Sequence, residues 1–135
     1  MSFVTIRSHQ IKGSGIGSKE IVPTINLAIP PSLILAQGIY AARVVLRFLE
    51  GGENRMDAVV HYGNRPVLRD ESPSLEVHIL NSADLKPYDS EDIQVEIVQF
   101  IRNVRDFDSF ESLRKQIQED LSEVRVILNN LSSSL

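Results

Sequence analysis

The chain contains 135 residues, of which 42% are hydrophobic and 24% are charged, and its formal net charge is −4 at pH 7. This length and composition predict one folded domain with its own core and exclude a disordered chain. The acidic balance argues against a nucleic-acid partner, because nucleic-acid-binding domains usually present a basic face. We therefore expect a small molecule or another protein as the partner.

The chain has no cysteine, which excludes disulfides and thiolate metal sites and fits a reducing cytosol. It contains no apolar run long enough to cross a bilayer and no charged-then-apolar signal at its start. We therefore expect a cytoplasmic protein with no membrane partner, and we expect it to be a monomer.

The first predicted strand, Phe3–Ile11, mixes β-branched and polar residues, and a glycine-rich loop follows it. Glycines allow backbone N–H groups to approach phosphate oxygens without a Cβ in the way. The candidate phosphate-binding residues of this loop are Gly13, Gly15, Gly17, Ser18 and Lys19. The alternative is a loop that only turns the chain, since glycine-rich loops often do no more than that.

The loop runs into Pro23-Thr24-Ile25-Asn26, a turn that carries one hydroxyl and one carboxamide. The Thr24 hydroxyl and the Asn26 carbonyl are hard oxygen ligands, of the kind that Mg²⁺ accepts while it keeps several of its waters. Thr24 and Asn26 are therefore the candidate residues for a Mg²⁺ ion and the phosphates of a nucleotide.

Five further strands are predicted by alternation of apolar and polar residues between turn-rich connections. They cover Thr24–Ile29, Gly38–Leu49, Met56–Tyr62, Ser74–Asn81 and Ile93–Ile101. Six strands joined in this way predict a fold dominated by β-structure, an antiparallel, Greek-key-like barrel that closes or nearly closes.

The last segment changes to a helical period, with apolar residues three and four positions apart from Phe110 to Leu131. Asp108, with Glu111 three positions later, resembles a capping box at its start. We expect one long C-terminal α-helix that covers an open side or end of the barrel. Residues 1–131 then form the barrel and helix, and residues 132–135 a frayed tail.

Glu76 and His78 alternate with Leu75, Val77 and Ile79 on the predicted fifth strand. One interpretation is a solvated strand face. The other is a cleft in which Glu76 accepts a proton from a substrate hydroxyl. Phosphoryl transfer needs little more than a metal–phosphate cradle and one such carboxylate.

Other common sites lack support in the sequence. The three histidines lie on separate predicted strands without metal-ligand spacing, and the glycine-rich loop does not end in the Gly-Lys-Ser/Thr of a Walker A motif. The loop is also not followed by the pattern of a Rossmann dinucleotide site.

Taken together, the ordered segments resemble the riboflavin kinase family over nearly the whole chain, from about Ile11 to Leu128. The segments that carry the resemblance are the glycine-rich loop, Pro23-Thr24-x-Asn26, Gly38-Ile39-Tyr40-Ala41, Gly63-Asn64-Arg65-Pro66, Glu76-Val77-His78-Ile79, Phe100-Ile101-Arg102, Phe107-Asp108-Ser109-Phe110-Glu111-Ser112-Leu113, and Gln116-Ile117-x-x-Asp120 with Arg125. Each short motif is weak alone, whereas the ordered set at matching separations is specific.

The resemblance implies a six-stranded barrel with a C-terminal helix that transfers the γ-phosphoryl of ATP to the 5′-hydroxyl of riboflavin, giving FMN. It implies that Thr24 and Asn26 hold Mg²⁺ and the phosphates, that the Gly13–Lys19 loop folds over the nucleotide, and that Glu76 deprotonates the ribityl hydroxyl. It also implies that the flavin is flanked by Gln116, Asp120, Arg125 and Tyr88. By its polar surroundings alone, Tyr88 would be an ordinary surface-loop residue.

In bacteria this kinase domain commonly follows an adenylyltransferase domain that makes FAD, and the chain resembles only the kinase half. The glycine-rich loop departs from the family, with Ile16 where an arginine is usual and Ile21 where a glycine is usual, and His61 stands where the family usually has Asn. Two alternatives therefore remain open. One is a non-catalytic flavin- or nucleotide-binding module, and the other is a ligand-free barrel whose apolar helix stripe docks a partner.

Overall fold

The structure, a computed structural model, describes residues 4–12, 23–65, 70–105 and 107–133. These residues form one antiparallel sheet and one long helix. The elements in chain order are β1 (Val4–Ser8), β2 (Gln10–Ile11), β3 (Thr24–Leu27), β4 (Gly38–Phe48), β5 (Glu53–Arg65), β6 (Asp70–Ile79), the 3₁₀ turn η2 (Ser82–Asp84), β7 (Tyr88–Arg102) and α1 (Phe110–Ser133).

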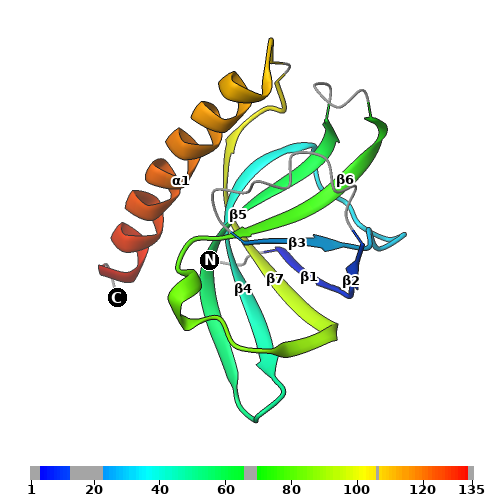
Figure 1. Cartoon of the computed structure of the whole chain (residues 1–135), viewed down its shortest axis with the longest axis vertical. Coiled ribbons are helices and arrows are strands. Elements are labelled where there is room, and N and C mark those ends of the chain that lie inside the picture. The colour runs from blue at the N-terminus through cyan, green and yellow to red at the C-terminus, as the bar shows by residue number, and fades with distance from the viewer. Residues whose placement is uncertain (1–3, 13–22, 66–69, 106, 134–135) are drawn as a thin grey trace.

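The strands follow the order β1-β7-β4-β5-β6-β3-β2 across a sheet that curls on itself, with α1 lying along one side (Figure 1). The predicted β-dominated barrel with a C-terminal helix is confirmed as a curled, half-barrel sheet. The first predicted strand is split into β1 and β2, which pair with β7 and β3 at the two edges of the sheet. One continuous segment of chain thus reaches both edges.

The split occurs at His9, where the backbone leaves one ladder and joins the other. The His9 carbonyl accepts a hydrogen bond from the Ala28 N–H at 3.0 Å, and the Ser8 hydroxyl donates to the Ala28 carbonyl. The Tyr88 hydroxyl donates to Gln10 Oε1 at 2.8 Å and so links β7 to β2. These bonds satisfy polar groups that an open sheet edge would leave unpaired.

The two faces of the sheet bury two separate hydrophobic cores. The inner core takes one set of alternating residues, among them Tyr40, Ala42 and Val60. The outer core takes the intervening residues of β4 and β5, such as Ile39 and Val59, and packs them against the helix. The period-two alternation of the strands therefore decides which side chains face the helix.

The helix packs on the outer face of β4 and β5, where Leu121, Val124 and Leu128 are almost fully buried. The middle of its predicted apolar stripe is thus covered by the chain's own sheet and is not free to dock a partner, while Phe110 at the start of the stripe is 48% exposed. The start also differs from the expected capping box. The Ser109 hydroxyl, and not Asp108, accepts the Ser112 N–H at 3.1 Å, as an N-cap residue does.

Several boundaries differ from the sequence-based expectation. β7 begins at Tyr88, so the surface loop expected there is wrong, and β5 continues through Gly63 to Arg65 where a turn was expected. The helix runs to Ser133, two residues into the segment expected to fray. The turn predicted between β4 and β5 is confirmed, and Gly51 and Gly52 both adopt positive φ there, a conformation that glycine takes at little cost.

Candidate active site

The candidate residues of the third and sixth strands lie directly opposite one another. Thr24 pairs with His78, and Asn26 pairs with Glu76, in the antiparallel ladder between β3 and β6. Their neighbours Ile25 and Val77 point into the inner core, so these four polar side chains share the outer face. The sheet therefore brings together the three residues that were expected to hold a metal–nucleotide group and to accept a proton.

Glu76 is buried, with a relative exposure of 7%, so the solvated strand face considered from the sequence is wrong for this residue. The Ser74 hydroxyl donates to Glu76 Oε2 at 3.3 Å. His61, its ladder partner on β5, places Nδ1 3.6 Å from the same oxygen. A carboxylate in such surroundings can accept a proton from a hydroxyl placed against it, provided that its polar neighbours offset the loss of water.

Thr24 makes a short cross-strand contact with His78. The distance between Thr24 Oγ1 and His78 Nδ1 is 2.8 Å, and both side chains are half-buried. The contact fixes the position of the Thr24 hydroxyl on the outer face, two residues before the Asn26 carboxamide on the same strand.

The donor set on β3 fits Mg²⁺. A hydroxyl and a carboxamide at alternate positions of one strand offer hard oxygens on a single face, and Glu76 adds a neighbouring negative charge. Among the described residues, no group of three or more His, Cys, Asp or Glu could hold a metal ion. Mg²⁺ is often held by one or two protein oxygens together with phosphates and waters, and this sparse set suits that mode.

The loop residues expected to bind phosphate, Gly13, Gly15, Gly17, Ser18 and Lys19, lie outside the residues that the structure describes. Their proposed role stays a prediction from the sequence.

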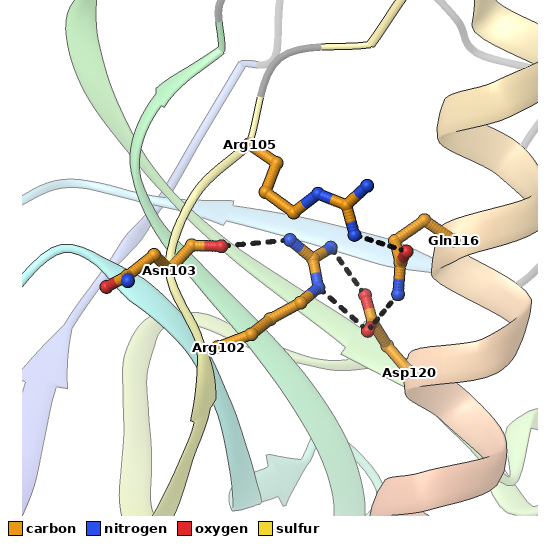
Figure 2. A network of polar contacts seen from close by, with 5 residues as sticks. All are labelled: Arg102, Asn103, Arg105, Gln116 and Asp120. Carbon is orange, nitrogen blue, oxygen red and sulfur yellow. Dashed lines mark hydrogen bonds and ion pairs between the residues drawn. The ribbon is translucent and has the colours of Figure 1, made fainter.

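Two of the residues expected beside the flavin, Gln116 and Asp120, come together on one face of α1 (Figure 2). Asp120 is buried and accepts hydrogen bonds from Arg102 Nε at 2.9 Å and Arg102 Nη2 at 2.7 Å. It also accepts one from Gln116 Nε2 at 3.1 Å, and Gln116 Oε1 accepts one from Arg105 at 3.0 Å. These contacts join the helix to the end of β7 and to the segment that follows it.

Arg102, the partner of Asp120, lies on the same row of the sheet as Glu76. Ladder partners run from Glu76 to His61, from His61 to Ile39, and from Ile39 to Arg102. Three strand spacings separate Glu76 from Arg102, which is at most roughly 14 Å along the sheet. Ile39, which lies between them on this row, is buried in the outer core against the helix.

The other two candidate flavin residues lie apart from this cluster. Arg125 is exposed, and its guanidinium donates to the Leu80 carbonyl at 3.4 Å. Tyr88 pairs with Phe48 at the opposite end of β7 from Arg102 and packs at the edge of the inner core. Burial raises the pKa of the Tyr88 hydroxyl above its usual 10.0, and the hydrogen bond to Gln10 opposes part of that rise.

Sequence reasoning missed the partners of these residues rather than the residues themselves. Alternation along β6 could have placed Ser74 on the face of Glu76, because the two are two positions apart. The closeness of His61 to Glu76 and of Arg102 to Asp120 depends on strand register and helix docking, for which the sequence carried no local signal.

The chain matches the family model described as Flavokinase, riboflavin kinase, over residues 2–128. The chain belongs to the flavokinase family. Flavokinase relatives include the human protein named riboflavin kinase, which is 31% identical over 126 residues, covering 88% of this chain and 77% of the human protein. The bifunctional riboflavin kinase/FMN adenylyltransferase of Escherichia coli K12 is 32% identical over 116 residues.

This flavokinase chain spans only about a third of the length of its bifunctional relatives, 35% of the Escherichia coli protein and 37% of the one from Haemophilus influenzae. A crystal structure described as a macrolide-efflux protein from Streptococcus pneumoniae matches 90% of this chain with a TM-score of 0.68 and 23% identity. At that identity the match supports the fold alone. Within the part of the chain that the structure describes, no helix is long and apolar enough to cross a membrane.

Proposed function

We propose that this flavokinase-family chain is a riboflavin kinase, which transfers the γ-phosphoryl group of ATP to the 5′-hydroxyl of riboflavin and gives FMN and ADP, with Mg²⁺ bound. The observation that carries the proposal is the alignment of Thr24 and Asn26 on β3 with His78 and Glu76 on β6, within a chain of this family. The relatives named riboflavin kinase support the substrate class.

In this proposal Thr24 and Asn26 hold Mg²⁺ and the nucleotide phosphates. The ion, when bound, would neutralise charge that develops on the phosphoryl oxygens. Thr24 and Asn26 orient the phosphates through their oxygens on one strand face. A fixed strand keeps this geometry better than a loop would, and phosphoryl transfer depends mainly on such positioning.

Glu76 would act as the base. Its carboxylate accepts the proton of the ribityl hydroxyl as the hydroxyl oxygen forms its bond to the γ-phosphorus and the bond to the β-phosphate oxygen breaks. The Ser74 hydroxyl, 3.3 Å from Glu76 Oε2, holds the carboxylate in place. The flavin ring would lie on the helix side of this site, toward Gln116 and Asp120.

The test is FMN formation by the purified chain with riboflavin, ATP and Mg²⁺. We expect FMN from the wild-type protein, a loss of about 10²–10⁴-fold in kcat for Glu76→Gln, and strong impairment for Thr24→Ala. Glu91→Gln, at an exposed acidic position on β7, is the matched control and should keep its activity. A folded wild-type protein that makes no FMN under saturating conditions would contradict the proposal, and flavin binding without turnover would identify a non-catalytic binding module.

A further inference from the structure

His78 lies beside the proposed metal site and has no role in the chemistry described above. It follows Glu76 by two residues on β6 and shares the outer face with it. Its ladder partner on one side is Thr24 and on the other is Val59, which belongs to the outer core under the helix. The imidazole therefore stands between the packed part of the outer face and the Thr24 hydroxyl.

The 2.8 Å contact between Thr24 Oγ1 and His78 Nδ1 can form in two ways. If Nδ1 carries no proton, it accepts the Thr24 O–H, and this contact uses neither lone pair of the hydroxyl oxygen. If Nδ1 carries the proton, it donates to Oγ1 and uses one of those lone pairs. A neutral hydroxyl that binds a cation gives up a lone pair and still needs an acceptor for its proton, and in the first arrangement His78 is that acceptor.

We propose that His78 is a positioning residue for Thr24. In the tautomer with its proton on Nε2, it accepts the Thr24 O–H through Nδ1 and turns the lone pairs of Oγ1 toward a bound divalent cation. The proposal rests on the proposed function, in which Thr24 is a ligand of Mg²⁺. It adds a residue that acts on the cation through its ligand and does not touch the cation, the nucleotide or the flavin.

The side chains favour such a role. Threonine is β-branched, so its χ1 has few choices, and one hydrogen bond is enough to select the direction of the hydroxyl. Groups that bond to metal ligands in this way orient them, and their loss commonly weakens metal binding by about 10–100-fold. A bond that only tied β3 to β6 would have no such effect on affinity for a cation.

Two substitutions separate these roles. In His78→Asn the amide oxygen can occupy the place of Nδ1 and accept the Thr24 O–H, whereas in His78→Gln the amide lies one carbon further out, near the place of Nε2. The probe is Mg²⁺·ADP, and its dissociation constant is measured by calorimetry. We expect an increase of about tenfold or more for His78→Gln and a value within about threefold of wild type for His78→Asn. His9→Gln, the same change at an exposed histidine, is the matched control and should leave the constant unchanged.

The coupling to Thr24 is tested in the Thr24→Ala background, where His78→Gln should have no further effect on Mg²⁺·ADP binding. Equal losses for His78→Asn and His78→Gln, or no loss in either, would overturn the proposal. A measurement on the unaltered protein guards against variants that fail to fold. The side-chain ¹⁵N shifts of His78 near pH 8 should place the proton on Nε2, and a proton on Nδ1 would overturn the proposal.

The same measurements distinguish failure of the proposed kinase function from failure of the proposed role of His78. Wild-type protein that binds Mg²⁺·ADP but makes no FMN would contradict the kinase activity and leave the variants to decide the role of His78. Wild-type protein that shows no Mg²⁺-dependent binding of ADP would overturn both.

Discussion

At the scale of single residues, the outer face of β6 combines burial with polar chemistry. Glu76 is 7% exposed, yet it is flanked by the Ser74 hydroxyl and by His61. A carboxylate is costly to remove from water unless hydrogen bonds or charges offset the loss, so a strand that only had to cover a core would be expected to carry an apolar residue there. Packing alone therefore does not explain a carboxylate at this position.

Tyr88 offers a test of the closure between β7 and β2. Loss of its hydroxyl in Tyr88→Phe removes the hydrogen bond to Gln10 and should lower the free energy of unfolding by about 1 kcal/mol at pH 7. Burial raises the pKa of Tyr88 in the folded state above 10.0. The folded chain thus keeps a proton that the unfolded chain releases near pH 10, and high pH favours unfolding.

The contribution of the Tyr88 hydroxyl is therefore complete below about pH 10 and is lost as the pH rises through the pKa of the folded state. Urea denaturation of wild type and Tyr88→Phe between pH 7 and 11 measures it. We expect the difference between the two proteins to shrink above pH 10. A difference that stays constant to pH 11 would contradict the assigned burial effect.

At the scale of elements, the Arg102–Asp120 pair fixes how α1 lies on the sheet. Asp120 is 3% exposed and Arg102 17% exposed in their side chains, and two hydrogen bonds join them. Arg102 and Arg105 also approach the ring of Phe107, with their guanidinium carbons 5.9 and 5.3 Å from its centre. The polar cluster thus organises the connection between β7 and α1 as well as the helix.

Asp120→Ala should be strongly destabilising, because it leaves the Arg102 guanidinium without its anion in a mostly buried place. Removing one partner of a buried pair commonly costs about 3–5 kcal/mol, and the residual exposure of Arg102 favours the lower value, about 3 kcal/mol. Urea denaturation measures the change. Glu119→Ala, at an exposed position next to it on the same helix, is the control and should change the free energy by less than about 0.5 kcal/mol. Equal effects of the two variants would show that the pair contributes little.

The elements themselves were largely predictable from sequence periods. Alternation located the strands, and the three-and-four spacing from Phe110 located the helix, because one face of each element must be buried. The break at His9 and the cap at Ser109 were missed. Each depends on a choice between competing local hydrogen bonds. At the helix start, Asp108 and Ser109 are adjacent and both carry a side-chain oxygen that can act as a cap.

The candidate site was predictable in part for the same reason. Alternation was enough to put Glu76 and His78 on one face of β6. It could not show that Thr24 lies opposite His78 or that His61 approaches Glu76, because a shift of one residue in register would separate both pairs. Tyr88 was misassigned to a loop because its polar neighbours Asp89 and Ser90 hide the start of a strand whose pairing with Phe48 is set by tertiary contacts.

At the scale of the whole molecule, the inner core and the candidate residues of β3 and β6 lie on opposite faces of the sheet. The inner core fills the curled sheet, and the outer core holds the helix over β4 and β5. The candidate residues occupy the same outer face on the neighbouring strands β3 and β6. Ligands bound there would contact strands that the inner core already holds in place, and so they should stabilise the folded chain as a whole.

This arrangement predicts linked stabilisation by ligands. A ligand that binds only the folded state at 100 times its dissociation constant adds about 2.7 kcal/mol to the free energy of unfolding. For a chain of this size that corresponds to a rise of roughly 10 °C in the melting temperature.

We expect such a rise with ADP and Mg²⁺, a further rise on addition of riboflavin, and a much smaller one when EDTA removes the Mg²⁺. Thr24→Ala should lose the Mg²⁺-dependent part and keep the part due to riboflavin, since riboflavin would lie toward the helix. Binding to the folded state at saturating concentrations raises the melting temperature. If saturating riboflavin, ADP and Mg²⁺ leave it unchanged, ligand binding on this face is contradicted.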